Sequence, residues 1–167
     1  MKKLARIAFI GLLASSMTSC YYPGYKLKPG DKIGNMELTT SFDKNIHELC
    51  DFTELSLGTC EIPAPESAIG ISTGWAEDTL EALNLAWAGS RWEMSIDNHQ
   101  VDLPSFGTFD LDFGGQKARV WDVGLLNFEP GKHTVQYDFH LENGARVGNH
   151  TQLFIFTVMA AEPPQSP

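Results

Sequence analysis

Apolar and polar residues alternate over the last part of the chain, and this alternation predicts β-strands. Residues 133–142 carry apolar side chains or His at every second position, with polar residues between them. A period of two is typical of a strand that buries one face. After a connector at 143–149, residues 151–159 are apolar on both faces, which predicts a more buried strand. We expect the two segments to pair as an antiparallel hairpin.

Shorter segments with the same period predict further strands. They lie at 33–40, 68–72, 91–97, 101–103 and 117–126. The segment 68–72 follows a connector broken by two Pro residues, so an edge position is expected for it. Turn residues at 97–100 should join 91–97 to 101–103 as a hairpin.

A further strand is predicted where Phe109, Leu111 and Phe113 alternate with Asp110 and Asp112. The expectation is that the apolar face of this strand is buried and that the two carboxylates face water. The alternative is calcium, because an Asp-x-Asp-x-Gly spacing resembles the start of an oxygen-ligand calcium loop. The later acidic ligands of such a loop are missing from the sequence.

One segment has a helical period. Leu80, Leu83 and Trp87 fall at positions i, i+3 and i+7, which predicts a short helix over about 79–88. A helix of three turns depends on packing rather than on propensity.

The residues that open the penultimate strand carry a resemblance to a known architecture. Pro130-Gly131, then His-Thr-Val-x-Tyr, and a closing Phe-Thr-Val resemble the last hairpin of immunoglobulin-like β-sandwiches of bacterial surface proteins. The resemblance implies a mainly β fold, an antiparallel immunoglobulin-like sandwich with one short helix. Such sandwiches often lack a helix at 79–88, so an α+β arrangement is the alternative. Residues 29–40 and 92–109 are also similar to exported bacterial proteins of unassigned function.

The first nineteen residues predict export. Lys2, Lys3 and Arg6 precede a short apolar run and a small, polar stretch, which is the architecture of a signal peptide. Met17-Thr18-Ser19-Cys20 resembles the cleavage motif of bacterial lipoproteins, and the resemblance implies that Cys20 becomes the first mature residue and carries the lipid. An ordinary secretory signal is the alternative. The resulting division is a signal peptide at 1–19, a tether at 20–32, a single β-rich domain at 33–159 and a frayed tail at 160–167.

Cysteine parity agrees with lipidation. The chain has three Cys, and modification of Cys20 leaves Cys50 and Cys60, which an oxidising compartment would join. Closing a loop of about ten residues should stabilise the fold by roughly 2 to 3 kcal/mol. A metal site that uses His47 with these two Cys is the alternative.

Charge excludes some partners. The chain of 167 residues has a net charge of −9, and loss of the signal peptide leaves 9 basic against 21 acidic residues, or −12. An anionic domain is repelled by phosphate backbones and by anionic lipid head groups. We therefore expect no nucleic-acid partner, and membrane attachment only through the lipid.

No sequence motif names a reaction. The chain has no Gly-x-Ser-x-Gly elbow, no phosphate-cradling loop and no His-Glu-x-x-His helix. The five His fall on expected turns and strand faces: His47, His99, His133, His140 and His150. We expect no cofactor and no catalysis; an envelope hydrolase with a site assembled from distant residues is the alternative.

The sequence thus predicts an envelope lipoprotein on the outer face of a bacterial membrane, with a non-enzymatic domain that binds a protein or glycan partner or supports the cell surface. The loops at 97–100 and 143–149 are the candidate contact regions. A carbohydrate or solute module is another alternative, and it would use the four Trp: Trp75, Trp87, Trp92 and Trp121. Their positions on periodic elements favour a place in the core instead.

Overall fold

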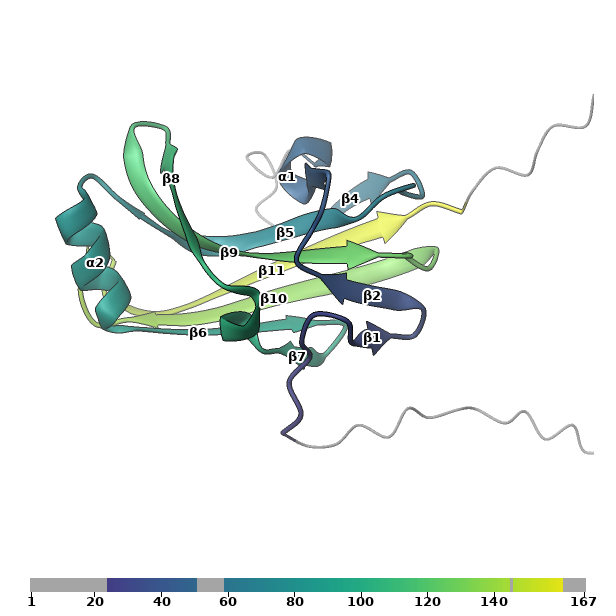
Figure 1. The fold of residues 1–167 in the computed structure, drawn as a ribbon, viewed down its shortest axis with the longest axis horizontal. Coiled ribbons are helices and arrows are strands. Elements are labelled where there is room, and N and C mark those ends of the chain that lie inside the picture. Colours follow the sequence, from purple (N-terminus) through teal and green to yellow (C-terminus); the bar gives the residue numbers. More distant parts are fainter. Residues whose placement is uncertain (1–23, 51–58, 145, 161–167) are drawn as a thin grey trace, which may run out of the picture.

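Two β-sheets packed face to face form the domain (Figure 1). This computed structural model describes residues 24–50, 59–144 and 146–160. Sheet 1 runs in the order β1 (Lys32–Ile33), β2 (Met36–Thr39), β9 (Gln116–Leu126), β5 (Ile69–Glu77) and β3 (Lys44–Asn45), and β8 (Phe109–Phe113) pairs with the first half of β9. Sheet 2 runs in the order β4 (Thr59–Ile62), β11 (Gly148–Val158), β10 (Gly131–Leu141), β6 (Ser90–Ile96) and β7 (His99–Val101).

The helices are short. They are α1 (Ile46–Leu49), α2 (Leu80–Ala88) and a 3-10 turn, η1 (Leu103–Phe106). The predicted helix is confirmed as α2, where the Thr79 hydroxyl caps the start by accepting from the Ala82 amide at 3.2 Å. Among the described residues, no helix combines the length and the apolar character that crossing a bilayer would require.

The prediction of a mainly β sandwich with one short helix is confirmed, with one difference in strand direction. Most pairs are antiparallel, whereas β4 runs parallel to β11 and β3 runs parallel to β5. Both sheets are therefore mixed. Between them lies one apolar core, in which Leu38, Ile96 and Val123 have no exposed surface.

Both predicted hairpins are present. β10 and β11 pair along their full lengths, from Gly131 opposite Val158 to Leu141 opposite Gly148. β6 and β7 are joined by a two-residue turn, Asp97-Asn98, whose φ angles are +48° and +64°. Positive φ at both positions is what a type I′ turn requires, and Asp and Asn tolerate it better than most residues.

Three expectations about burial and packing were wrong. β11 is not the more buried strand, because Leu153 on its outward face is 49% exposed. On α2, the helical spacing is correct, with Leu83 fully buried and Leu80 half exposed. The segment predicted as an edge strand continues to Glu77 and lies between β9 and β3. The chain also joins the domain earlier than expected, since Leu27 is buried and its backbone bonds to β7.

One crossing segment determines the shape of sheet 1. After β2 the chain passes over the outer face of the sheet and reaches β3 on the other side of β5 (Figure 1). Two glycines that pair with each other, Gly70 and Gly124, make room for it. A Cβ on Gly70 would lie 2.5 Å from the Phe42 ring, and one on Gly124 would lie 2.7 Å from the Thr39 side chain. The crossing segment therefore packs directly on the sheet backbone.

Candidate functional site

The apolar face of β8 is turned to solvent. Phe109 is 46% exposed and Phe113 is 67% exposed, and Leu111 between them is only partly buried. The alternation read from the sequence is correct, but the expectation that this face is buried was wrong. An exposed face of large apolar residues on an ordered strand is the usual mark of a contact surface.

The opposite face of β8 is tied to the fold by ion pairs. Arg119 of β9 donates from Nε and Nη2 to the two carboxylate oxygens of Asp110, at 2.6 and 2.8 Å. The next carboxylate of β8 toward the turn, Asp112, forms an ion pair with Lys117 of β9. The Arg119 hydrogen bonds hold the pKa of the Asp110 carboxyl below its usual value. Each of the two carboxylates is therefore paired with a cation of β9. In this structure they act as partners of Arg119 and Lys117, and not as the calcium ligands of the alternative.

Arg119 also connects the hairpin to α2. Its Nη2 donates to the Asn84 Oδ1 at 3.1 Å, and its guanidinium lies 5.6 Å from the centroid of the Trp87 ring. The charged face of the β8–β9 hairpin therefore points toward α2, where it finds partners. The apolar face has to point away.

The apolar face of β8 continues across three strands, although Ala118 in the middle of it is itself buried. Residues that pair directly share a face, and each row here is apolar. The rows are Phe109–Val120–Gly74 and Leu111–Ala118–Ala76, with Phe113 beyond them at the end of β8. We call these seven residues the hairpin patch. Gly74 is needed at the β5 end of its row, because a Cβ there would overlap the carbonyl oxygen of Arg119.

A polar group borders the hairpin patch. The Ser72 hydroxyl donates to Asp122 directly across the pair, and Asn45 donates to the Ser72 oxygen. Burial raises the pKa of Asp122, against the opposing effect of the Ser72 hydrogen bond. Burial also lowers the pKa of His47. A serine nucleophile would donate to a histidine base; Ser72 donates to a carboxylate instead.

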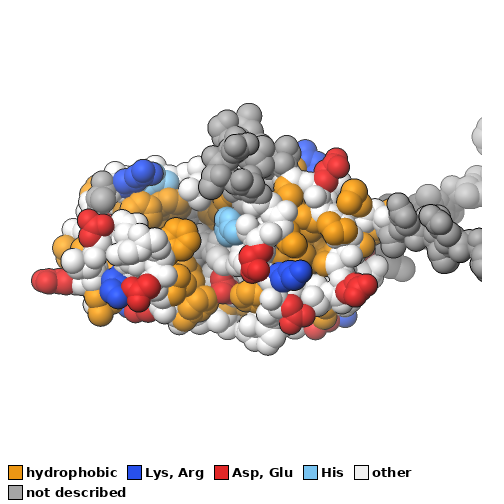
Figure 2. Space-filling view, turned by 90° about the horizontal axis from the view of Figure 1, so that it is seen from above, with side chains coloured by type: hydrophobic (Ala, Val, Ile, Leu, Met, Phe, Trp, Pro, Cys, Tyr) orange, Lys and Arg blue, Asp and Glu red, His pale blue; other side chains and the backbone are white. Residues whose placement is uncertain are grey.

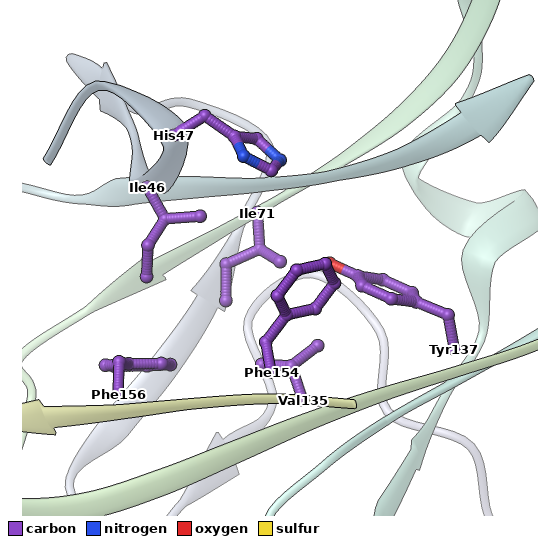
Figure 3. A pocket seen from close by; sticks show the side chains of 7 residues that line it. All are labelled: Ile46, His47, Ile71, Val135, Tyr137, Phe154 and Phe156. Atoms are coloured by element: carbon purple, nitrogen blue, oxygen red, sulfur yellow. The ribbon is translucent and has the colours of Figure 1, made fainter. Parts of the chain in front are cut away.

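A small recess lies beneath His47, between the two sheets. Ile46, Ile71, Val135, Tyr137, Phe154 and Phe156 line it together with the imidazole, and their side chains converge on it from α1 and both sheets (Figure 3). Its volume is about 10 Å³, which suffices for about one water molecule. The recess is a packing feature rather than a site for a substrate.

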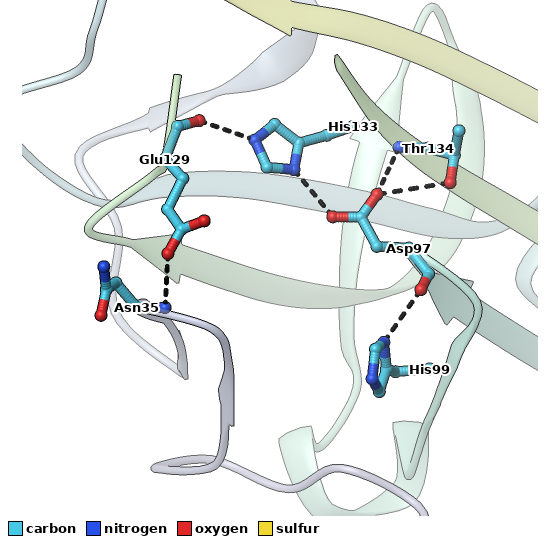
Figure 4. A network of polar contacts seen from close by, with 6 residues as sticks. All are labelled: Asn35, Asp97, His99, Glu129, His133 and Thr134. Atoms are coloured by element: carbon cyan, nitrogen blue, oxygen red, sulfur yellow. Dashed lines mark hydrogen bonds and ion pairs between the residues drawn. The ribbon is translucent and has the colours of Figure 1, made fainter. Parts of the chain in front are cut away.

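The first candidate loop, at 97–100, is part of a structural network. Asp97 accepts from His133 Nδ1 at 2.7 Å and from the Thr134 amide at 2.8 Å, while His133 Nε2 bonds to the Glu129 carbonyl at 2.9 Å (Figure 4). The Glu129 side chain in turn accepts from the Asn35 amide at 3.1 Å. The network joins the turns at one end of the sandwich.

The structure does not bring the two candidate loops together. The loop at 143–149 follows the end of β10, whereas Asp97 bonds to the start of β10, and the strand between them is eleven residues long.

A hollow lined by exposed side chains lies elsewhere on the surface. On the outer face of sheet 2 a broad hollow of about 360 Å³ is lined by polar side chains such as Arg91, Glu93 and His140. Asp138 and Thr151 in it bond to each other, as expected of a solvated face.

The four Trp lie together at the α2 end of the domain. Trp121 is buried, and its ring lies 4.5 Å from that of Trp87 and 5.6 Å from that of Trp92. Trp75 packs on Phe139 at 5.9 Å. They form a packed cluster rather than a row of exposed rings for a sugar, which agrees with the core interpretation.

The predicted disulfide is present. Cys50 and Cys60 are bonded, with their Cα atoms 5.8 Å apart, and they join α1 to β4. Their sulfurs are therefore not available as the thiolate ligands of the alternative metal site. Cys20 and the rest of the predicted signal segment lie outside the described residues.

Figure 2 shows the domain from the side where α1 lies. Hydrophobic side chains form separate patches along this face, with acidic and basic side chains between them. Sequence reasoning found the three apolar residues of β8 in the hairpin patch and missed that they are exposed; it did not find the residues that β9 and β5 contribute. The one available signal was the pair of basic residues, Lys117 and Arg119, at positions that can reach two Asp across a hairpin.

Comparison with known proteins gives little. No family model matches the chain, and no curated protein matches it. A cysteine protease inhibitor of Entamoeba histolytica, EhICP2, is similar in structure with a TM-score of 0.36 and 10% identity, over 64% of this chain and 90% of the other. A chain from the structure of PbICP-C in complex with falcipain-2 has a TM-score of 0.35 and 14% identity, over 81% of this chain and all of the other. Similarity at this level does not transfer a function, which therefore rests on the chain's own surface.

Proposed function

We propose that this chain is a lipoprotein of the bacterial cell envelope whose β-sandwich is a non-enzymatic, protein-binding module, and that the hairpin patch is its binding surface. The observation that carries the proposal is the exposed apolar face of β8. Phe109 and Phe113 face solvent on it, while Asp110 and Asp112 on the other face are paired with cations of β9.

Energetics supports a protein partner. Apolar surface contributes about 25 cal/mol for each Å² removed from water, so a partner that covers the exposed rings of Phe109 and Phe113 would gain stabilisation from their burial. Aromatic residues are enriched in the buried centres of protein interfaces. The seven residues of the hairpin patch are apolar or Gly, and the Ser72 and Asp122 side chains at its border bond to each other, so they are not free to orient a sugar. A protein surface fits it better than a glycan.

The position of the hairpin agrees with an anchor at Cys20. The first described residues enter at the bottom of Figure 1, where Leu27 forms a bridge to β7, and the tip of the β8–β9 hairpin lies at the top. A lipid four residues before Gly24 would hold the domain by its lower side. The tip of the hairpin would then lie on the side away from the membrane, where other envelope proteins can reach it.

Site-specific photocrosslinking in the producing cell tests the binding surface. A benzoylphenylalanine at position 113 should crosslink to one discrete protein, and the same residue at position 153 should not. Leu153 is the matched control because it is 49% exposed on β11, outside the hairpin patch. The double variant Phe109→Ser/Phe113→Ser should abolish the interaction, and Leu153→Ser should retain it. Equal crosslinking from both positions would remove the proposal.

The anchor is tested separately. Growth with a clickable fatty acid should label the wild-type chain and leave Cys20→Ala unlabelled. The intact mass of the mature wild-type protein should correspond to a chain that begins at position 20 and carries acyl chains. A mature chain of the same length without acyl groups would show ordinary secretion instead.

A further inference from the structure

We propose that the partner binds by adding a strand to the open edge of β8, and that the added segment is extended, with apolar and basic side chains in alternation. The inference rests on the proposed function and specifies how the hairpin patch is used. Strand addition takes affinity from main-chain hydrogen bonds and specificity from alternate side chains.

One edge of β8 is open. In the part of the chain that the structure describes, β8 pairs with β9 alone, so one side of β8 has no neighbouring strand. The hairpin turn is Gly114-Gly115, with φ angles of +60° and +89°. A two-residue turn of this kind makes the flanking residues, Phe113 and Gln116, a hydrogen-bonded pair.

The register then determines which backbone groups are open. Hydrogen-bonded pairs alternate along an antiparallel ladder. The backbone N–H and C=O of Phe113 point to β9, because Phe113 and Gln116 form a hydrogen-bonded pair. Two and four residues earlier, the backbone groups of Leu111 and Phe109 point to β9 as well. The amides and carbonyls of Asp110 and Asp112 consequently point to the open edge. Two residues therefore offer the donors and acceptors that an added strand needs.

An added strand would meet apolar side chains on one face and carboxylates on the other. On one face it would lie beside Phe109, Leu111 and Phe113, which select apolar residues. On the other face it would lie beside Asp110 and Asp112, whose side chains are 47% and 72% exposed. Each carboxylate has one cation on β9 and retains acceptor positions on its other side. A Lys or Arg at alternate positions of the added strand would complete this arrangement.

The same charges argue against a second copy of this chain as the occupant. Two β8 strands that pair antiparallel about Leu111 would place Asp110 of one copy directly opposite Asp112 of the other. Like charges opposite each other destabilise a sheet. The mature chain of the proposed lipoprotein would carry a net charge of −12, which disfavours self-association and favours a cationic partner.

The test uses the full chain and three synthetic peptides of equal length. One alternates Val and Lys, one alternates Val and Glu, and one has the composition of the first in two blocks, all Val and then all Lys. We expect the alternating Val-Lys peptide to bind about tenfold more tightly than either of the others. It should also slow hydrogen exchange of the Asp110 and Asp112 amides, read by NMR, about tenfold, with the Leu153 amide unchanged. Equal affinity of the block peptide would overturn the inference, because charge alone would then explain binding.

Two variants separate the local carboxylates from the overall charge. Asp110→Asn/Asp112→Asn should weaken the alternating Val-Lys peptide about tenfold. Glu66→Gln/Glu93→Gln removes two exposed charges elsewhere and should leave its affinity unchanged. Equal weakening by both double variants would contradict the inference.

The two proposals fail in different ways. A partner that crosslinks at position 113 without protecting the Asp110 and Asp112 amides would overturn strand addition and leave the binding surface in place. Protection of both amides in a dimer of the chain, found by light scattering, would overturn the choice of occupant. Binding of the alternating peptide without any crosslinked protein in the cell would remove the proposed function and support the edge as a peptide-binding strand.

Discussion

The ion pair between the buried His133 and the partly buried Asp97 gives a sharp prediction about stability and pH. Both ring nitrogens of His133 face acceptors, the Asp97 carboxylate at 2.7 Å and the Glu129 carbonyl at 2.9 Å. A neutral imidazole has one N–H and can donate to one of them, so the arrangement requires the cation. The hydrogen bond to Asp97 is the largest cause of a raised His133 pKa, in spite of burial, which lowers it.

The size of the effect follows from the contacts that are lost. In Asp97→Ala, the hydrogen bonds from His133 and from the Thr134 amide disappear, and each bond to a charged group is worth about 1.5 kcal/mol at a partly exposed site. Asp97 also has a φ of +48°, which costs Ala about 1 kcal/mol. The free energy of unfolding should therefore fall by about 4 kcal/mol. Asp97→Asn keeps the turn and the Thr134 bond and should cost about 1.5 kcal/mol.

The sign of the pH dependence is set by both partners. Burial raises the pKa of Asp97, yet its hydrogen bonds from His133 and Thr134 prevail and lower it overall. Its contribution is therefore present above the ordinary value of 3.8 and is lost as pH falls through the lowered pKa. The contribution of His133 is present below 6.5 and is lost as pH rises through the raised pKa. The pair stabilises the fold fully between these two values.

Urea unfolding followed by Trp fluorescence, from pH 6.5 upward, measures this contribution. Wild type should lose stability over this range, and the loss should largely disappear in Asp97→Asn, where the amide can donate to a neutral His133. His47 does not interfere, because its lowered pKa acts below 6.5. His140→Asn, on the outer face of sheet 2, is the control and should keep the wild-type slope. If Asp97→Asn keeps it too, the charged-pair reasoning is refuted.

Three further measurements test the packing. Gly70→Ala places a methyl group against the Phe42 ring and should lower the free energy of unfolding by about 2 kcal/mol, with partial recovery in Gly70→Ala/Phe42→Ala; no recovery would place the clash elsewhere. Replacement of Cys50 and Cys60 by Ser should lower the free energy of unfolding in urea by about 3 kcal/mol, and a reducing agent should lower the stability of the wild type but not of this variant. Thr79→Ala should cost about 1 kcal/mol, while Thr79→Ser retains stability; equal losses would show that the cap is unimportant.

The sequence was sufficient for the strands and their faces where one face meets the core. His133, Val135 and Tyr137 alternate in the chain and are all buried in the structure. The Asp97-Asn98 turn was equally readable, because few residue pairs tolerate two positive φ angles. Cysteine parity predicted the disulfide between Cys50 and Cys60. These inferences depend on local rules that the rest of the fold does not change.

Long-range packing was not readable in the same way. The crossing segment over Gly70 and Gly124 depends on two glycines that are far apart in the chain and become neighbours only when β5 pairs with β9. The parallel pairing of β4 with β11 also joins distant segments. Periodicity says that Leu153 and Phe154 lie on opposite faces, but it does not say which strands will cover each face.

The β8 strand shows the same limit at the place that matters for function. Alternation separates Phe109 and Phe113 from Asp110 and Asp112, and the hydrophobic effect alone would turn the two Phe inward. The partners of the carboxylates decide otherwise. Arg119 binds Asp110 with two nitrogens and is itself held by Asn84 and the Trp87 ring, all on the α2 side of the hairpin. If this clamp sets the orientation, Arg119→Met should release the hairpin, raise hydrogen exchange along β8 and weaken crosslinking from position 113, although the hairpin patch itself is unaltered. Crosslinking at wild-type strength in that variant would mean that the partner, and not the clamp, orients the two Phe.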